Sequence, residues 1–191
     1  MVRAAGIELY WLPLGAGGWL VRRCGRAYEA VVARRERRPT RDLYHSALIV
    51  RAADGRFVIE MAPIPDGDGA RRGVVSEGPV GSRLAARLRL FRYEVRRWQD
   101  GVIPDVDEAV ESPRLLTSDD ARARHVLELV ASVPTPVWGR DELDLGEMWN
   151  SNSLVSWLLV RAGFEPESIA LPSGGRAPGW DAGVEAALRR L

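Results

Sequence analysis

The stretch GEMWNSNSLVSWLLVRAG, residues 146 to 163, predicts the helix around which the chain folds. Its aliphatic residues recur at helical spacing, and they are Leu154, Val155, Leu158, Leu159 and Ala162. The Asn-Ser-Asn-Ser run suits the start of a helix, and Gly163 suits its end, because glycine readily adopts the left-handed conformation found there. We therefore expect a buried core helix over residues 151–162.

The second strong pattern is a β-hairpin within DLYHSALIVRAADGRFVIEMAPIP, residues 42–65. Two apolar runs, rich in β-branched residues, flank the pair Asp54-Gly55, which is favoured in tight hairpin turns. His45 lies near the start of the first run, and Glu60 lies in the second. We expect two paired antiparallel strands that carry these two side chains.

Weaker patterns complete the expected sheet. Residues 7–14 have the composition of a strand, and residues 89–98 alternate apolar with charged side chains, which predicts a strand with one face toward solvent. A further short strand is expected at Val74 and Val75. The predicted fold class is α+β, an antiparallel sheet of four or more strands packed against the core helix.

The remaining segments are expected to be helices and linkers of a single domain that spans residues 1–191. The sequence favours helices over three ranges: 27–38, 118–132 with Ser118 as its cap, and 183–191. Proline, glycine and acidic residues without periodicity indicate irregular linkers at about 62–82, 101–117 and 133–148.

Composition argues against several classes of function. The 27 cationic residues are all arginine, and 26 acidic residues balance them, so we expect no nucleic-acid binding and attribute the arginines to a GC-rich bacterial genome. The one cysteine, Cys24, excludes an intrachain disulfide and favours a soluble protein in a reducing cytoplasm. No apolar run is long enough for an integral membrane segment. The two histidines and the cysteine lack metal-ligand spacing, so neither a metal nor a cofactor is expected.

One histidine and one serine form the most reactive pair that the sequence offers. His45 follows Asp42 and Tyr44 at the mouth of an apolar strand, where a neutral imidazole can act as a base. Ser151 opens the core helix, where unpaired N–H groups and a partial positive charge favour a nucleophile. His125 lies in an amphipathic helix and is interpreted as a surface residue. The pair predicts acyl transfer through a serine.

A structural interpretation of the same helix start is also open, because asparagine and serine are the preferred N-caps. A cap uses one residue, whereas this cluster supplies four, so the others could hold a loop or contact a ligand. The candidate binding residues are Trp149, Asn150, Asn152, Ser153 and Tyr44. Ser153 is an alternative nucleophile, with Ser151 as the cap.

These two motifs resemble a known group of proteins. YHSALIV, followed by a glycine turn and a second strand, is similar to the histidine strand of the circularly permuted papain-like group, which includes lecithin retinol acyltransferase and is related to NlpC-type peptidases. WNSNSLVSWLL resembles the Asn-Cys motif that opens a helix in its acyltransferase branch, with Asn150 on the asparagine and Ser151 on the cysteine. The resemblance implies a papain-like core in which His45 is the base, Ser151 the nucleophile and Glu60 the residue that orients the imidazole.

Two functional hypotheses follow from the resemblance. The first is an amide or ester hydrolase or acyltransferase that acts on a small-molecule, lipid or peptide substrate. The second is a catalytically inactive protein of the same fold that binds a ligand or partner, because a serine hydroxyl is far less ionised than the thiol that it replaces.

Overall fold

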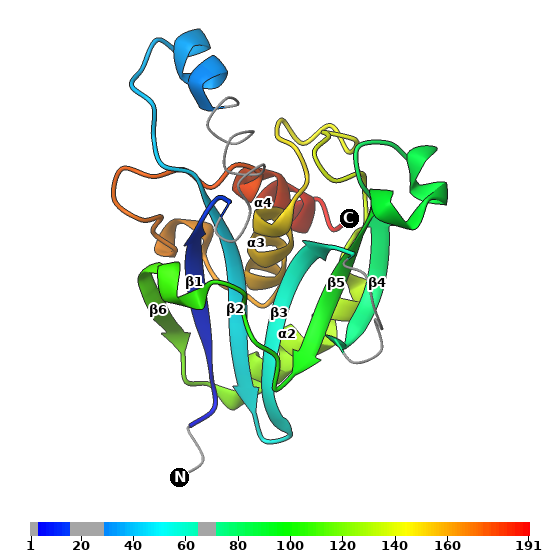
Figure 1. Ribbon diagram of the computed structural model, residues 1–191. Coiled ribbons are helices and arrows are strands. Elements are labelled where there is room, and N and C mark those ends of the chain that lie inside the picture. Colours follow the sequence, from blue (N-terminus) through cyan, green and yellow to red (C-terminus); the bar gives the residue numbers. More distant parts are fainter. Residues whose placement is uncertain (1–3, 16–28, 65–71) are drawn as a thin grey trace.

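The computed structural model describes residues 4–15, 29–64 and 72–191, and its centre is a six-stranded sheet (Figure 1). The strand order is β4-β5-β3-β2-β1-β6, and every neighbouring pair is antiparallel. The strands are β1 (Gly6–Pro13), β2 (Tyr44–Ala52), β3 (Gly55–Pro63), β4 (Val74–Pro79), β5 (Arg92–Gln99) and β6 (Val110–Thr117). The predicted α+β class with an antiparallel sheet is therefore confirmed.

The hairpin of β2 and β3 forms as its sequence predicts. Ala52 pairs with Gly55 at the turn, and the register continues to Leu48 opposite Ile59. Gly55 has a φ of 140°, a backbone conformation that residues with a Cβ rarely adopt. The turn thus fixes the register that gives every β2 side chain its face of the sheet.

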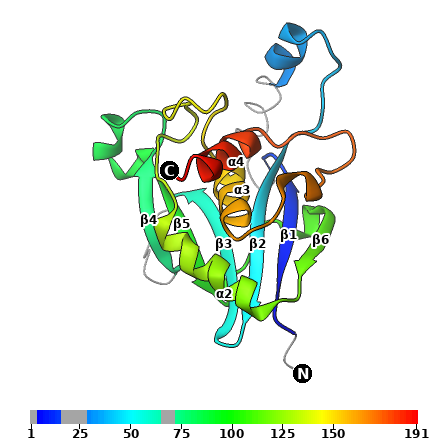
Figure 2. The same ribbon diagram turned by 180° about the vertical axis from the view of Figure 1, so that it is seen from behind.

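Three helices pack together on one face of the sheet, as Figures 1 and 2 show from opposite sides. They are α2 (Asp120–Leu129), α3 (Ser151–Arg161) and α4 (Trp180–Leu188). The main core lies between these helices and the sheet, and α3 is central to it: Leu154, Val155, Leu158 and Leu159 are fully buried. The expected core helix is confirmed. Among the residues described, no helix is long and apolar enough to cross a bilayer.

The other face of the sheet carries a smaller apolar core, which the segment between β5 and β6 covers as it crosses the sheet (Figure 1). Ile103 is buried in this core, where Leu12 of β1 and Ile49 of β2 are also buried. The crossing was expected for residues 101–117, but the prediction of an irregular loop throughout was wrong, because residues 110–117 form strand β6. This strand adds to the sheet beside β1.

Three element boundaries differ from the sequence predictions. Asp119, not Ser118, caps α2, since its Oδ1 accepts hydrogen bonds from the backbone N–H groups of Ala121 and Arg122. Helix α4 begins at Trp180 rather than Gly183. Residues 29–35 are helical, and the remainder of the expected helix 27–38 either adopts turns or lies, like Cys24, outside the described residues.

Candidate functional site

The Asn-Ser-Asn-Ser run opens α3 with a capping box. The Oδ1 atom of Asn150 accepts a hydrogen bond of 2.8 Å from the backbone N–H of Asn152. Ser153 returns the contact, because its Oγ accepts from the backbone N–H of Asn150 at 3.0 Å. Two backbone donors that the first turn of a helix would leave unpaired are thus satisfied by side chains.

Polar side chains in and next to this run also join α3 to the start of α4. Asn150 and Asn152 each donate a side-chain N–H to the carbonyl of Pro178. Ser153 Oγ donates to the carbonyl of Gly179, and Ser156 Oγ donates to that of Trp180, both at 2.7 Å. We call these four side chains, with the carbonyls of residues 178–180, the polar junction.

Asn152 also ties the polar junction to the sheet. Its Nδ2 donates to the carbonyl of Tyr44 at 2.9 Å, and its Oδ1 accepts from the hydroxyl of Ser46 at 2.8 Å. Asn152 is 2% exposed and Ser153 is fully buried. Buried polar groups are costly unless they are hydrogen-bonded, so these bonds explain why Asn152 and Ser153 are tolerated at the start of a core helix.

The structure does not bring His45 to Ser151. Tyr44, Leu48 and Val50 of β2 pack in the core beneath α3, and successive side chains of a strand point to opposite faces. His45 therefore lies on the face away from α3, and its partner in the register with β1 is Leu12, which is buried in the core of that face. The hydrogen-bonded pair that acyl transfer requires is not formed.

Ser151 is buried at the first position of α3, and its hydroxyl has no hydrogen-bond partner within the described parts of the chain. It is 6% exposed. Among Ser151, Asn152 and Ser153, it is the only one whose side chain takes no part in the polar junction. Ser153 is fully engaged, so the alternative that it is the reactive serine has less support than Ser151.

Glu60 does not orient the imidazole of His45 but belongs to a buried ionic network. Its carboxylate accepts a hydrogen bond of 2.7 Å from Arg96, its neighbour in β5, and Arg96 also donates to Glu94. Glu94 accepts a further pair of bonds from Arg72. The expectation that charged residues of strand 89–98 face solvent was wrong, since Glu94 and Arg96 are 1% and 5% exposed.

Burial and pairing shift the acid–base properties of this network in opposite directions. Burial raises the pKa of the Glu60 carboxyl, and the hydrogen bond from Arg96 offsets this only in part. Burial also acts to raise the pKa of Glu94, but its bonds from Arg72 and Arg96 outweigh burial, and that pKa lies below its ordinary value. Arg96 is thus the cation that Glu60 and Glu94 share, and Arg72 is a second cation for Glu94.

His45 titrates far below the usual range for histidine. Burial lowers the pKa of its imidazole from 6.5 to about 4, and the Asp105 carboxylate opposes this effect. An imidazole with this pKa is neutral at physiological pH and is a weak base, which is unfavourable for general-base catalysis.

The shift of His45 predicts how stability depends on pH. Because the folded-state pKa is lower than the unfolded-state value, folding disfavours the protonated ring, and stability is retained above about pH 6.5 and lost as the pH falls toward about 4. We expect a loss of about 2 kcal/mol between about pH 7 and pH 5 from this group. Urea unfolding of the wild type, His45→Gln and His125→Gln across this pH range checks the prediction, because only His45→Gln should lack this loss. An unchanged pH dependence in His45→Gln contradicts it.

Trp149, one of the candidate binding residues, is a core residue. Trp149 is 1% exposed and belongs to the main core. Trp11 and Trp180 pack against each other with ring centroids 5.1 Å apart. Trp149 is therefore not placed to contact a ligand, whereas Tyr44 is, because it lines the largest of the pockets described here.

This pocket has a volume of about 820 Å³ and lies where β1 ends and β2 and β6 begin. We call it the Tyr44 pocket. The segments that line it are residues 13–14 and 40–44, Glu29, Glu108, Val110 and residues 173–174. Its size is within the range of small-molecule sites. Asn152 bonds the carbonyl of Tyr44, so the pocket and the start of α3 lie at the same end of the sheet.

Acidic residues predominate among the charges that line the Tyr44 pocket. The lining contains the carboxylates of Glu29, Asp42 and Glu108 and one guanidinium, that of Arg41. Hydrogen bonding by Arg38 lowers the pKa of Glu29, so that this carboxylate is ionised and paired. Asp42 forms no ion pair with any residue in the parts of the chain that the structure describes. Burial raises the pKa of the Tyr44 hydroxyl, and the nearby charge of Asp42 adds to that effect, so the hydroxyl stays protonated.

A backbone contact holds the aromatic wall of the Tyr44 pocket in place. A Cβ at Gly175 would lie 2.3 Å from Cε2 of Tyr44, so only glycine lets the loop approach the ring this closely. The backbone N–H of Tyr44 donates to the carbonyl of Arg176 at 2.8 Å. Sequence reasoning identified Tyr44 but missed the rest of the pocket, since its residues are generic polar types from distant parts of the chain.

A scan against protein-family models, a search of curated proteins and a search of solved structures each found no match. Within residues 4–15, 29–64 and 72–191, no group of three or more histidine, cysteine or acidic side chains is arranged to hold a metal ion.

Proposed function

We propose that this protein is a non-catalytic binding protein whose Tyr44 pocket holds a small ligand that carries an amine. The observation that carries the proposal is the pocket of about 820 Å³ with three carboxylates and one guanidinium in its lining. An acidic concave site favours cationic ligands. Asp42, without an ionic partner among the described residues, is the group that we expect to pair with the amine.

The positions of the candidate catalytic residues support binding rather than turnover. His45 lies on the face of the sheet away from α3, and Glu60 is paired with Arg96. The side chain of Asn152 is hydrogen-bonded to the sheet, and that of Ser153 is hydrogen-bonded within the polar junction. The scaffold that we propose is the permuted papain-like one that the two sequence motifs resemble, used here without an assembled catalytic pair.

The serine hydrolase or acyltransferase is the second candidate function. The observation in its favour is that Ser151 stands at the first position of α3 with no hydrogen-bond partner among the described residues, next to backbone donors of the helix start. It has less support because a serine nucleophile needs a base, and His45 lies on the other face.

The binding proposal predicts selectivity between two probes of equal chain length, cadaverine and glutarate. In saturation-transfer NMR, cadaverine should receive signal from the protein, whereas glutarate should not, because the Asp42 carboxylate attracts only the amine. Asp42→Asn should weaken cadaverine binding by about fivefold, the effect of one partly exposed ion pair of about 1 kcal/mol. Gly175→Ala should weaken it as well, since its Cβ displaces the Tyr44 ring.

The matched control is Asp54→Asn, which removes an exposed carboxylate at the opposite end of β2, in the hairpin turn. It should leave cadaverine binding unchanged. Equal binding of the two probes, or equal effects of Asp42→Asn and Asp54→Asn, would refute the proposed site.

A further inference from the structure

A group of large apolar side chains is exposed between β4 and β5. Leu84, Leu88, Leu90 and Phe91 are 71%, 63%, 79% and 39% exposed. They belong to residues 82–92, which form two short 3-10 helices, η2 (Ala85–Arg87) and η3 (Arg89–Phe91). Figures 1 and 2 both show this segment projecting from the body of the molecule beyond the ends of β4 and β5. We call residues 82–92 the arginine–leucine tip.

The arginine–leucine tip is strongly cationic. It carries four arginines and no acidic residue, whereas the whole chain has a net charge of only +1. The cations alternate with the exposed apolar residues along the segment, in the order Arg83, Leu84, Arg87, Leu88, Arg89, Leu90. Positive charge and exposed hydrophobic surface therefore coincide at one projecting site.

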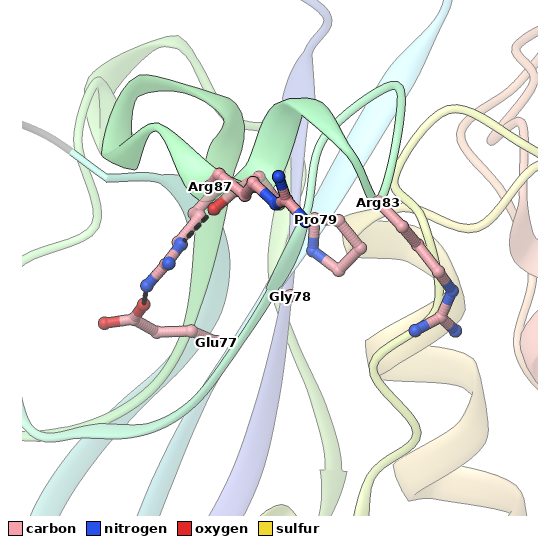
Figure 3. A pocket seen from close by; sticks show the side chains of 7 residues that line it. Glu77, Gly78, Pro79, Arg83 and Arg87 are labelled. Carbon is pink, nitrogen blue, oxygen red and sulfur yellow. Dashed lines mark hydrogen bonds and ion pairs between the residues drawn. The ribbon is translucent and has the colours of Figure 1, made fainter.

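A small cavity of about 360 Å³ lies between the arginine–leucine tip and β4 (Figure 3). Three arginines line it. Arg83 pairs with Glu142, and Arg92 pairs with Glu77. Arg87 has neither an ion pair nor a side-chain hydrogen bond within the described residues. Arg87 lines the cavity, where its guanidinium can pair with an anion from outside.

We propose that the arginine–leucine tip docks on the surface of a membrane that contains anionic phospholipids. Leucine and phenylalanine side chains on a projecting segment can enter the boundary between head groups and acyl chains without a preformed groove. Guanidinium groups between them remain at the level of the lipid phosphates, to which they can donate bidentate hydrogen bonds. The attraction of each cation to an anionic leaflet adds to the apolar contribution. This interaction is independent of the ligand proposed for the Tyr44 pocket.

Sedimentation with vesicles tests the docking. The wild-type chain should sediment with vesicles of phosphatidylcholine that contain roughly a third phosphatidylglycerol, and not with pure phosphatidylcholine, because the tip is cationic. The double variant Leu88→Ser/Leu90→Ser should lower partitioning by about tenfold or more, since two inserted side chains are lost. Arg87→Ser should lower it about fivefold, the value of one cation near an anionic surface.

Matched variants separate the tip from general surface properties. Leu115→Ser/Leu188→Ser removes two leucines that are similarly exposed, at 61% and 64%, and Arg34→Ser removes an exposed arginine elsewhere. Neither should change partitioning. The proposal is overturned if the wild-type chain does not sediment with anionic vesicles at low salt, or if tip and control variants lose binding equally. It is also overturned if the chain instead self-associates in sedimentation velocity through Leu88 and Leu90, because the tip would then be an interface between copies.

Discussion

Replacing Asn152 with alanine is expected to destabilise the folded chain by about 3 kcal/mol or more, whereas the same change at the adjacent Ser151 should cost less than about 0.5 kcal/mol. Asn152→Ala leaves the carbonyl of Tyr44 and the hydroxyl of Ser46 without their buried partner. Each buried group left unpaired costs about 1–3 kcal/mol. Ser151 has no bond to lose among the described residues.

Urea unfolding followed by tryptophan fluorescence measures this difference. The two variants are matched, because both truncate a buried polar side chain in the first turn of α3. A large loss for Asn152→Ala with native-like Ser151→Ala supports a structural role for the helix start. Equal losses would show that the bonds of Asn152 do not stabilise the fold as the polar junction requires.

The second large effect is expected at Arg96. Arg96→Met leaves the buried carboxylate of Glu60 without its cation and leaves Glu94 with Arg72 alone, which should cost about 3–5 kcal/mol. Arg92→Met, a change in the same strand, is the control. Arg92 pairs with Glu77 at the surface, where an ion pair is worth about 1 kcal/mol or less. Thermal and urea unfolding of the two variants at neutral pH measure the contrast.

The pH dependence of Arg96→Met supplies a second measurement. Without the arginine, the folded-state pKa of Glu60 should rise further, because burial already raises it and the opposing hydrogen bond is lost. For a carboxyl whose folded-state pKa exceeds the unfolded-state value, stability is present below the unfolded-state pKa and is lost as the pH rises through the folded-state pKa. Arg96→Met should therefore be closer to wild type in mild acid than at neutral pH. A destabilisation equal to that of Arg92→Met would contradict the network.

The elements whose sequence carries a period and clear end signals were predicted well. Helix α3 combines apolar helical spacing with a cap and a terminal glycine, and the hairpin combines two β-branched runs with Asp54-Gly55. Strand β6 was missed because Pro113 and its acidic neighbours are unfavourable in strands, although pairing with β1 at the edge of the sheet tolerates them. Pairing with β1 determines the strand conformation of this segment, and no local sequence pattern indicates that pairing.

The site was harder to predict because both faces of the sheet are apolar. In β2 the apolar run Ala47–Val50 has no polar residue at alternate positions, so the sequence does not reveal which face the imidazole of His45 occupies. The alternation of Glu94 and Arg96 with apolar residues is equally consistent with a solvated face and with a buried ion-pair network. Only the register against β3, which places Arg96 opposite Glu60, distinguishes them.

The most direct test of binding without turnover is to treat the wild-type chain and Ser151→Ala with a fluorophosphonate probe while measuring cadaverine binding by NMR. We predict no adduct on Ser151 or Ser153 under conditions that fully label a control serine hydrolase, and cadaverine binding that Ser151→Ala leaves unchanged. A stoichiometric adduct on Ser151 that disappears in Ser151→Ala and is reduced in His45→Gln would contradict the account and establish the serine as a nucleophile.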